Sequence, residues 1–563
     1  MKKYFSIIIC LLIVTNLKSQ TPQFSWAKQL GGSYAVQSLS IAVDQAENVY
    51  TTGCYYNLAD FDPGTPTYNL TSNGGSDVFI SKLDKHGNFK WAKSIGGIQN
   101  DFGMAITTDS FGNIYTTGIF VGTVDLNPNA GTQTVTALGA DMFIIKLDSS
   151  GNFIWAKSVG GHVESYSIKT DKYGNIYTSG HFNNTSDFDP GTGINNLTAS
   201  GSLHRDVFIL KLNSNGDFQW AKNLGGDSID GSSSLSIDMS GNVYSTGIFS
   251  DTADFDPGLA VYNLISSNNS SAYINKLDSM GNFIWAKQII GNSGGQSIKS
   301  DLNGNVYIVG FFTDTADFDT GSSIFNLISV GNDDMFILKL DSSGNFLWAK
   351  QIGGTYKNIY YGLGIDYENN IYTSCIFNGI IDVDPNVGVV NLNSNSNYDA
   401  FILKLDSNGS YKWAGQLEGS QTKWPHSVFV DNNLNIYITG HFSQTADFNP
   451  DSVAVFNLTS KGSVDVFILK LTQKSINQAI PENPNFELNS IYPNPTNGLI
   501  NISLLQAEQN FSVKVFNSNG VLMYHDENLT NKSAIDLSQN SPGLYILKVY
   551  KKNKILYYKL IIE

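Results

Sequence analysis

A Trp-Ala dipeptide recurs along most of this 563-residue chain at nearly constant intervals. The tryptophans are Trp26, Trp91, Trp155, Trp220, Trp285, Trp348 and Trp413, spaced by 65, 64, 65, 65, 63 and 65 residues. The surrounding phrase is closely preserved, as in LDSSGNFIWAK from Leu147 and LDSMGNFIWAK from Leu277. Repetition at a fixed period is typical of architectures whose single units cannot bury an apolar face alone. We therefore interpret the phrase as a building block, with its tryptophan packed between neighbouring units, rather than as a repeated ligand site.

Each period contains four stretches in which apolar and polar residues alternate. SLSIAVD, ending at Asp44, exemplifies the first stretch, GNVYSTGIF from Gly241 the second, and DVFISKLD from Asp77 the third. A D-x-x-G-N turn then leads into the fourth, which contains the tryptophan. This pattern predicts two β-hairpins per unit. Four-stranded units of this kind form the blades of β-propellers, and a linear β-solenoid is the competing arrangement.

The two ends of the array favour a closed ring. The array begins with a bare closing strand, QFSWAK at Gln23–Lys28, and ends at DVFILKL, Asp465–Leu471, without one. In a ring the N-terminal strand would complete the last blade and remove both exposed edges. The sequence therefore predicts an all-β fold with a seven-bladed propeller over residues 23–471, closed by the N-terminal strand.

An acidic insert lies between the second and third strands of each unit, typified by TADFDPGLAVYNLIS from Thr252. Its flanks predict an extra small hairpin, with the aromatic residue of D-F-D buried and both carboxylates facing solvent. Paired carboxylates could bind Ca²⁺, whereas Asx turns would use the same oxygens for backbone amides. No copy matches a full calcium loop, so the turn is favoured and no other cofactor is expected. The candidate metal ligands are Asp60, Asp62, Asp187, Asp189, Asp254, Asp256, Asp317, Asp319, Asp382 and Asp384.

Charge and motif content exclude several function classes. The net charge of −15 argues against nucleic-acid partners, because phosphate binding needs a basic surface. Arg205 is the only arginine, so a cluster of carboxylate-binding arginines like that of sialidases cannot be built. The sequence contains none of the short metalloprotease, serine hydrolase, CxxC or phosphate-loop motifs.

The N-terminus predicts export. A basic start and an apolar stretch over Tyr4–Val14 precede Ser19, which suits a signal peptide spanning 1–19. No later segment approaches the ~20 apolar residues of a transmembrane helix. Cys54 and Cys375 fall in the first and sixth units, which do not adjoin, so both are expected to be buried free thiols.

After a polar linker at 472–487, residues 488–563 form a different unit. Short strands at LINISLL, FSVKVFN, GLYILKVY and KILYYKLII predict a small Ig-like β-sandwich. YPNPTNG at Tyr492–Gly498, VKVFNSNGVL at Val513–Leu522 and LSQNSPGLYILKV at Leu537–Val549 resemble the type A sorting domain of the type IX secretion system. The motif positions are Tyr492, Pro493, Asn494, Pro495, Gly498, Gly520, Pro542, Gly543 and Tyr545. One departure is KKNK at Lys551–Lys554, where family members often carry a glycine turn.

These resemblances imply a destination and partners. The sorting domain implies type IX machinery as a partner, in a Bacteroidetes-type bacterium, and a secreted or outer-membrane-surface protein whose tail is cleaved or anchored. The array resembles SBBP β-propeller repeats, which share DFDPG, NLTS and F-x-W-A-K, and that family implies no catalytic residues.

The function predicted from these features is a non-catalytic binding or scaffold module of adhesin type, with an unidentified protein or glycan ligand. The alternative is an extracellular polysaccharide hydrolase or lyase that uses a propeller face. Near-identity among the units favours binding, because catalysis would require unusual residues in one or two of them. The most divergent stretches contain Trp424, His426 and Arg205, which are the candidate ligand residues.

Overall fold

The computed structural model describes residues 21–200, 204–266, 269–354, 359–394, 398–451, 454–473, 488–492, 496–504, 511–517, 522–529, 533–540, 543–551 and 554–562. Every regular element in these ranges is a β-strand. The chain divides into two compact parts, Met1–Ser475 and Ile476–Glu563. The predicted signal peptide (1–19) lies outside the described residues, as does the predicted linker from residue 474 on.

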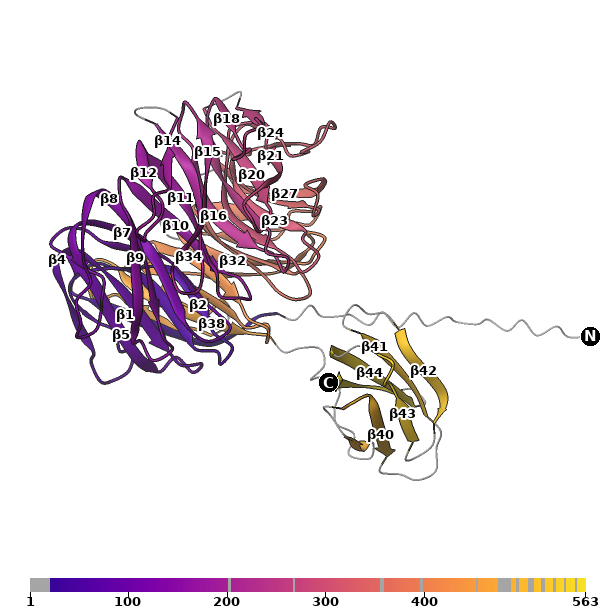
Figure 1. Ribbon diagram of the computed structural model, residues 1–563. Coiled ribbons are helices and arrows are strands. Elements are labelled where there is room, and N and C mark those ends of the chain that lie inside the picture. Colours follow the sequence, from indigo (N-terminus) through magenta and orange to yellow (C-terminus); the bar gives the residue numbers. More distant parts are fainter. Residues whose placement is uncertain are drawn as a thin grey trace, which may run out of the picture. The chain divides into compact units, whose positions relative to one another are not determined.

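The N-terminal part consists of β-propeller-like repeats of four antiparallel strands (Figure 1). Repeat 1 contains β2 (Val36–Val43), β3 (Val49–Asp60), β4 (Asn69–Leu83) and β5 (Phe89–Gly97). Repeat 2 contains β6 (Phe102–Thr108), β7 (Ile114–Asp125), β8 (Thr134–Leu147) and β9 (Phe153–Val159). Repeat 3 contains β10 (Val163–Thr170), β11 (Ile176–Asn183), β14 (Arg205–Leu212) and β15 (Phe218–Gly226). Repeat 4 contains β16 (Gly231–Ile237), β17 (Val243–Phe249), β20 (Ser271–Leu277) and β21 (Phe283–Gln288).

The remaining repeats follow the same order. Repeat 5 contains β22 (Ser293–Ser300), β23 (Val306–Phe312), β26 (Asp334–Leu340) and β27 (Phe346–Gly354). Repeat 6 contains β28 (Ile359–Ile365), β29 (Ile371–Phe377), β32 (Asp399–Leu405) and β33 (Tyr411–Leu417). Repeat 7 contains β34 (Lys423–Val430), β35 (Ile436–Phe442), β38 (Asp465–Thr472) and the N-terminal strand β1 (Gln23–Gly32).

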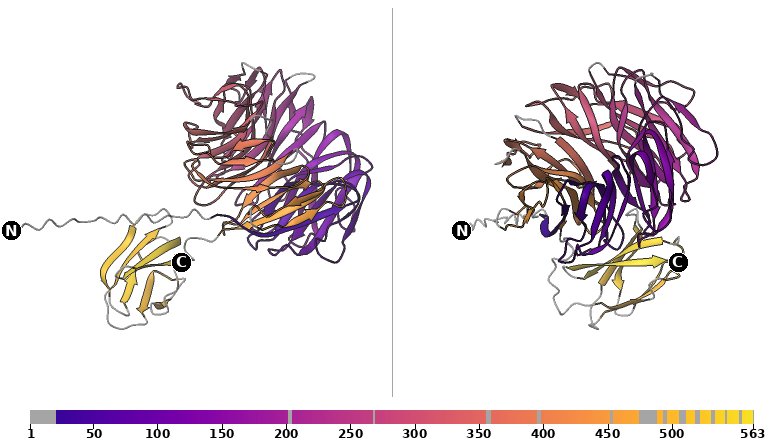
Figure 2. Two further views of the ribbon diagram at one scale, coloured as in Figure 1. Left: turned by 180° about the vertical axis from the view of Figure 1, so that it is seen from behind. Right: turned by 90° about the vertical axis from the view of Figure 1, so that its left-hand side faces the viewer.

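The predicted pairing of the two ends of the array is confirmed. β1 lies antiparallel to β38, with Phe24 opposite Leu471 and Ala27 opposite Leu469. The first strands of the repeats contact one another in the order β2, β6, β10, β16, β22, β28 and β34, and β34 also contacts β2. The repeats follow one another around a curve that brings the orange strands beside the indigo ones (Figure 2, right). The succession of contacts therefore returns to its start.

The tryptophans join neighbouring repeats, as predicted. In repeat 1 the Trp91 indole N–H and the Lys82 ammonium both donate to the carbonyl of Ser149, in a turn of repeat 2, at 3.4 and 2.7 Å. At the junction of repeats 7 and 1, Trp26 and Lys470 donate to the carbonyl of Lys85 in the same way, at 3.2 and 3.4 Å. The closing junction thus uses the same contacts as the internal ones.

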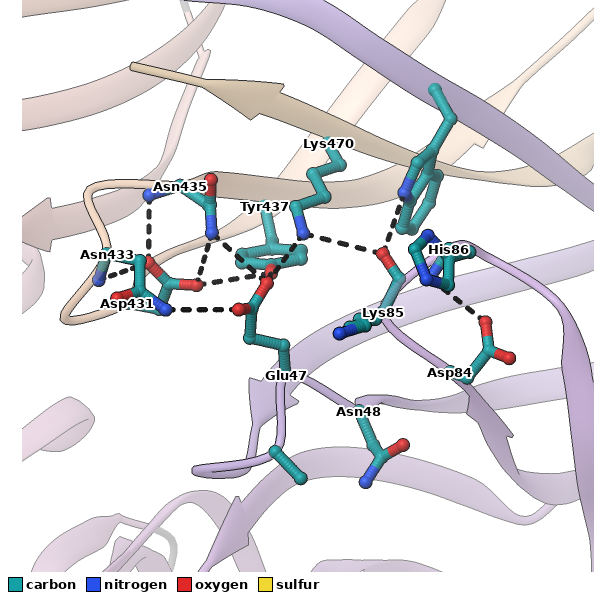
Figure 3. A network of polar contacts seen from close by, with 12 residues as sticks. Glu47, Asn48, Asp84, Lys85, His86, Asp431, Asn433, Asn435, Tyr437 and Lys470 are labelled. Carbon is teal, nitrogen blue, oxygen red and sulfur yellow. Dashed lines mark hydrogen bonds and ion pairs between the residues drawn. The ribbon is translucent and has the colours of Figure 1, made fainter. Parts of the chain in front are cut away.

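The closing junction also has a contact network of its own, centred on Glu47 (Figure 3). Glu47 accepts hydrogen bonds from Lys470 at 2.9 Å, Asn433 at 3.0 Å and Asn435 at 3.3 Å. Burial raises the pKa of Glu47, but the hydrogen bond and charge of Lys470 outweigh it, so the pKa lies below its usual value. The carboxylate of the first repeat is therefore held ionised against the last repeat.

The predicted insert hairpins are present and connect adjacent repeats. Separate hairpins are β12 (Thr185–Asp187) with β13 (Asn196–Thr198), β18 (Thr252–Asp254) with β19 (Asn263–Ile265), β24 (Thr315–Asp317) with β25 (Asn326–Ile328), β30 (Ile380–Asp382) with β31 (Asn391–Asn393), and β36 (Thr445–Asp447) with β37 (Asn457–Thr459). In repeat 1 the insert extends β3 and β4, and there Ala59 pairs with Gly32 of the preceding repeat. A side chain at Gly32 would place its Cβ 2.2 Å from the Leu58 carbonyl oxygen, so this contact requires glycine.

Buried polar pairs differ from one junction to the next. Asp206 and Asp230, between repeats 3 and 4, are both fully buried, and one oxygen of Asp206 has no hydrogen-bond partner. Burial raises the pKa of Asp230 to about 7, and the charge of Asp206 raises it further. At the next junction Ser271 and Ser293 occupy the same positions without charge.

We expect stability to fall as pH rises from near 4 to about 7, because the folded protein keeps a proton on Asp230 that the unfolded chain has released. The double variant Asp206→Ser/Asp230→Ser copies the Ser271–Ser293 pair and should flatten this decline by a few kcal/mol. Urea unfolding at several pH values measures the effect. Parallel stability curves for the two proteins would contradict it.

The C-terminal part has two antiparallel sheets. One contains β39 (Leu488–Tyr492), β40 (Leu499–Leu504) and β43 (Ser533–Asp536). The other contains β42 (Leu522–Leu529), β41 (Phe511–Asn517), β44 (Gly543–Lys551) and β45 (Lys554–Ile562). Ile500 and Ile535 from the first sheet share one buried cluster with Val513 and Leu547 from the second.

Candidate ligand-binding site

A β-bulge interrupts the first strand of every repeat at the same position. In repeat 1, Ser38 pairs with Gly53 and Ser40 pairs with Thr52, so Leu39 between them has no partner. A bulge leaves one residue unpaired and turns its side chain out of the regular alternation. The residues at this bulge position in repeats 1–5 and 7 are Leu39, Met104, Tyr166, Ser233, Gln296 and His426.

All six bulge residues line one cavity of about 470 Å³. His181, Arg205, Gly231, Ser232 and Ile248 complete its lining. Because the first strands contact one another in succession, the cavity lies at the centre of the repeats. Its volume is within the range of small-molecule sites.

The bulge position varies where the neighbouring core position does not. Two residues further along, the residues facing the core are all aliphatic, namely Ile41, Ile106, Ile168, Leu235, Ile298, Leu363 and Val428. The six bulge residues, by contrast, are of six different types. The repeat therefore preserves what packing requires and varies the group that faces the cavity.

Arg205 and three neighbours form the most polar part of the lining. The guanidinium Nη1 lies 3.0 Å from His181 Nε2. Since arginine can only donate, that nitrogen must be the acceptor of a neutral imidazole. Burial and the charge of Arg205 lower the pKa of His181 to about 4, although Glu164 opposes them. Tyr166 stacks on the His181 ring at 5.4 Å and donates its hydroxyl to Glu164.

His426 is supported by a second aromatic group. Its Nε2 lies 3.2 Å from Nδ1 of His441, and the His441 ring stacks on Trp424 with centroids 5.9 Å apart. Burial lowers the pKa of His426 to about 3 and that of His441 to about 4, and the charge of His441 contributes at His426. Both rings are therefore neutral at physiological pH.

The structure thus brings together two of the three candidate ligand residues. Arg205 and His426 line the same cavity, and Trp424 stacks beside His426 without being part of the lining. The sequence analysis missed the other bulge residues, Tyr166 and Gln296 among them. Aligning the repeats position by position would have revealed a column of six residue types beside an aliphatic column.

The acidic inserts form consecutive Asx turns. Asp254 Oδ1 accepts from the backbone N–H groups of Asp256 and Tyr262 at 3.0 and 2.8 Å, and Asp256 Oδ1 accepts from Gly258 at 2.8 Å. The same pattern occurs at Asp60, Asp62, Asp187, Asp189, Asp317, Asp319, Asp382 and Asp384. Phe255, between the two carboxylates, is buried as predicted. In the described ranges no group of three or more His, Cys, Asp or Glu side chains could hold a metal.

Calcium binding by these inserts stays a prediction. Because one oxygen of each carboxylate already accepts amide protons, we expect Ca²⁺ followed by a chelator to leave the melting temperature unchanged. Thermal unfolding with and without the metal tests this. A rise with Ca²⁺ that the chelator reverses would instead establish a metal site.

Only part of the predicted sorting motif falls on described side chains. Tyr492 ends β39, while Pro493, Asn494, Pro495, Gly520 and Pro542 lie outside the described residues. Gly498 has a φ of 107°, and a Cβ there would approach Ser538 Cα to 2.4 Å. Gly543 begins β44, and Tyr545 is buried in the core. The motif's described glycine and tyrosine therefore have structural roles within this part.

The remaining thiol and membrane predictions can be compared directly. Cys54 and Cys375 are buried free cysteines, as predicted. Among the described residues, no helix is long and apolar enough to cross a bilayer.

Comparison with known families supports both resemblances. Residues 490–563 match the secretion system C-terminal sorting domain, and residues 25–53 and 90–118 match the SBBP β-propeller repeat. Both resemblances inferred from the sequence are confirmed. The sorting domain indicates export to the cell surface or secretion.

Individual relatives add less. The uncharacterized WD repeat-containing protein L264 of Acanthamoeba polyphaga mimivirus is 24% identical over 502 residues, covering 74% of this chain. This chain spans only 36% of that relative. PorZ, an essential surface component of the type IX secretion system of Porphyromonas gingivalis, aligns over 95% of this chain and 100% of its own, with 11% identity and a TM-score of 0.16. The plexin A4 extracellular region covers 82% of this chain and 52% of its own, with 7% identity and a TM-score of 0.26. Neither score supports an inference about this chain.

Proposed function

We propose that this chain, which carries SBBP β-propeller repeats and a type IX secretion system sorting domain, is a non-catalytic binding protein of the cell surface. Its repeats form a closed seven-bladed propeller, and the central cavity holds the ligand. The C-terminal part is an Ig-like sandwich that directs export and is then removed or used for attachment. Adhesion or scaffolding is the role that such a binding site would serve.

The observation that carries this proposal is the set of bulge residues. Six chemically different side chains from six repeats converge on one cavity, while the packing positions beside them stay aliphatic. A purely structural array would have no reason to vary one inward position in this way. A site that recognises an asymmetric ligand requires such variation.

Closure of the ring is supported by three sets of contacts. β1 pairs with β38, β34 contacts β2, and Trp26 and Lys470 join repeats 7 and 1 through the Lys85 carbonyl. A closed ring leaves no unpaired sheet edge at either end. It would also fix the relative positions of the cavity residues.

The enzyme alternative has less support in the lining. Most glycosidases use a pair of carboxyl groups, and none of the described cavity-lining residues is Asp or Glu. Both lining histidines are held as neutral bases by burial.

A cavity-filling variant tests the binding function. We expect Ser233→Trp to abolish the binding that the wild type shows on a glycan array and to immobilised surface proteins. Ser343→Trp, in an exposed turn of repeat 5, is the matched control and should bind normally. Gln296→Ala, which shortens a lining side chain, should weaken the same binding without filling the cavity. Binding that all three variants retain would refute the cavity as the site.

A further inference from the structure

The cavity contains a guanidinium group with unused donors. Arg205 is the only arginine of the chain, and in the described ranges its side chain has one hydrogen-bond partner, His181. Its Nε is buried without a partner. Glu164, the carboxylate beside His181 and Tyr166, is not within 4.0 Å of the guanidinium. An arginine that faces a cavity without a carboxylate has donors available for a ligand.

Two lysines add positive charge along the same strands. Lys169 in β10 and Lys299 in β22 each follow the bulge residue by three positions, roughly 10 Å along the strand. Both are half-buried, and among the described residues neither forms an ion pair or a hydrogen bond with an acidic side chain. Burial lowers the pKa of Lys169 to about 7, and the charge of Lys299 lowers it further.

These two lysines belong to repeats that are not adjacent. β16 lies between them and contacts both β10 and β22. Their charges therefore interact across the space that the first strands enclose. Elsewhere the buried lysines are compensated, as Lys423 is by Asp399 and Lys470 by Glu47.

The interior charge is opposite to that of the whole molecule. The chain has a net charge of −15, yet the described cavity lining holds one cation and no anion, with two further lysines deeper along the strands. Uncompensated buried cations are costly unless an anion joins them. In a surface protein that is otherwise acidic, such a group of cations favours selective binding of a negative ligand.

We infer that the ligand of this cavity carries a carboxylate, which the planar guanidinium of Arg205 binds through paired hydrogen bonds. This inference rests on the proposed binding function. Ser233, Gln296 and Tyr166 provide uncharged hydrogen-bonding groups for the rest of the ligand. Lys169 and Lys299 increase the attraction without contacting the carboxylate directly. A uronic acid sugar and a simple organic acid would both present this chemistry.

Calorimetric titration of the full-length mature protein with galacturonate, galactose and acetate tests the inference. Galacturonate and galactose differ only in the carboxylate, so we expect galacturonate to bind and galactose to bind at least about tenfold more weakly. Acetate distinguishes the sources: affinity equal to that of galacturonate assigns a simple acid, and weaker affinity assigns a sugar acid. Added NaCl should weaken the binding.

Variants locate the effect. Arg205→Gln should reduce galacturonate affinity about ten- to hundredfold, the loss expected for charged hydrogen bonds. Lys169→Met/Lys299→Met should reduce it less and should flatten its dependence on salt. Lys90→Met, an exposed lysine of β5 paired with Asp84, is the control and should change neither.

The inference and the proposed function fail separately. Equal affinity for galactose and galacturonate, or unchanged galacturonate affinity in Arg205→Gln, would refute the carboxylate. If binding of the neutral sugar is still lost in Ser233→Trp, the cavity keeps its binding function. If neither acid nor any arrayed ligand binds in a way that Ser233→Trp abolishes, both are refuted.

Discussion

A chain without Gln23–Gly32 is expected to lose cooperative folding of its N-terminal part. β1 supplies the fourth strand of repeat 7, and its removal would expose the edge of β38 along its whole length. It would also remove Leu30, which is fully buried, and Trp26, which bonds repeat 1. Losses of this kind total on the order of 10 kcal/mol, comparable to the stability of a typical domain.

Circular dichroism and urea unfolding measure this loss, and a sequence swap provides the control. Replacing β1 by the sequence of β15, FQWAKNLGG, restores a closing strand with different flanking residues. We expect the swapped chain to fold and the truncated chain to aggregate or unfold non-cooperatively. A truncated chain with normal cooperative unfolding would show that β1 does not close the ring.

Replacement of Trp285 by alanine should cost about 3–5 kcal/mol of unfolding free energy. The indole is 9% exposed and belongs to a buried cluster with Ile298 and Ile308 of the next repeat. Its N–H donates to the Ser342 carbonyl at 3.3 Å, which joins repeats 4 and 5. The variant therefore loses apolar contacts and a hydrogen bond at one junction.

Urea unfolding of the variant and of Ile284→Ala measures this cost. Ile284 is adjacent on the same strand but 43% exposed, so its truncation should cost below about 1 kcal/mol. Equal losses for the two variants would mean that the tryptophan does not hold the repeats together.

The repeats could be predicted because their signals are local. Strict alternation, D-x-x-G-N turns and the constant Trp spacing specify strands and hairpins without knowledge of tertiary structure. Asp109 shows why the turn recurs: its carboxylate accepts from the amides of Phe111 and Asn113 and from the Tyr115 hydroxyl. Each residue of that phrase serves the turn itself, so its pattern survives in every copy.

The cavity could be predicted only in part, because a bulge is a feature of strand pairing. Simple alternation assigns Tyr166 and Gln296 to a sheet face, and only the interrupted register turns them toward the centre. Arg205 was identified because it is the sole arginine. Lys169 and Lys299 looked like ordinary strand lysines, since nothing local indicates that two non-adjacent repeats bring their charges together.

Oxidative crosslinking of β1 to β38 tests the closed ring most directly. Gln23 and Thr472 are opposite one another and accessible, so cysteines placed there should be within disulfide distance. The account predicts a nearly complete intramolecular disulfide in Gln23→Cys/Thr472→Cys. It predicts none in Gln23→Cys/Asn213→Cys, which uses the equivalent position of repeat 3. A failure of the first pair to crosslink in folded protein, or equal crosslinking of both pairs, would contradict ring closure.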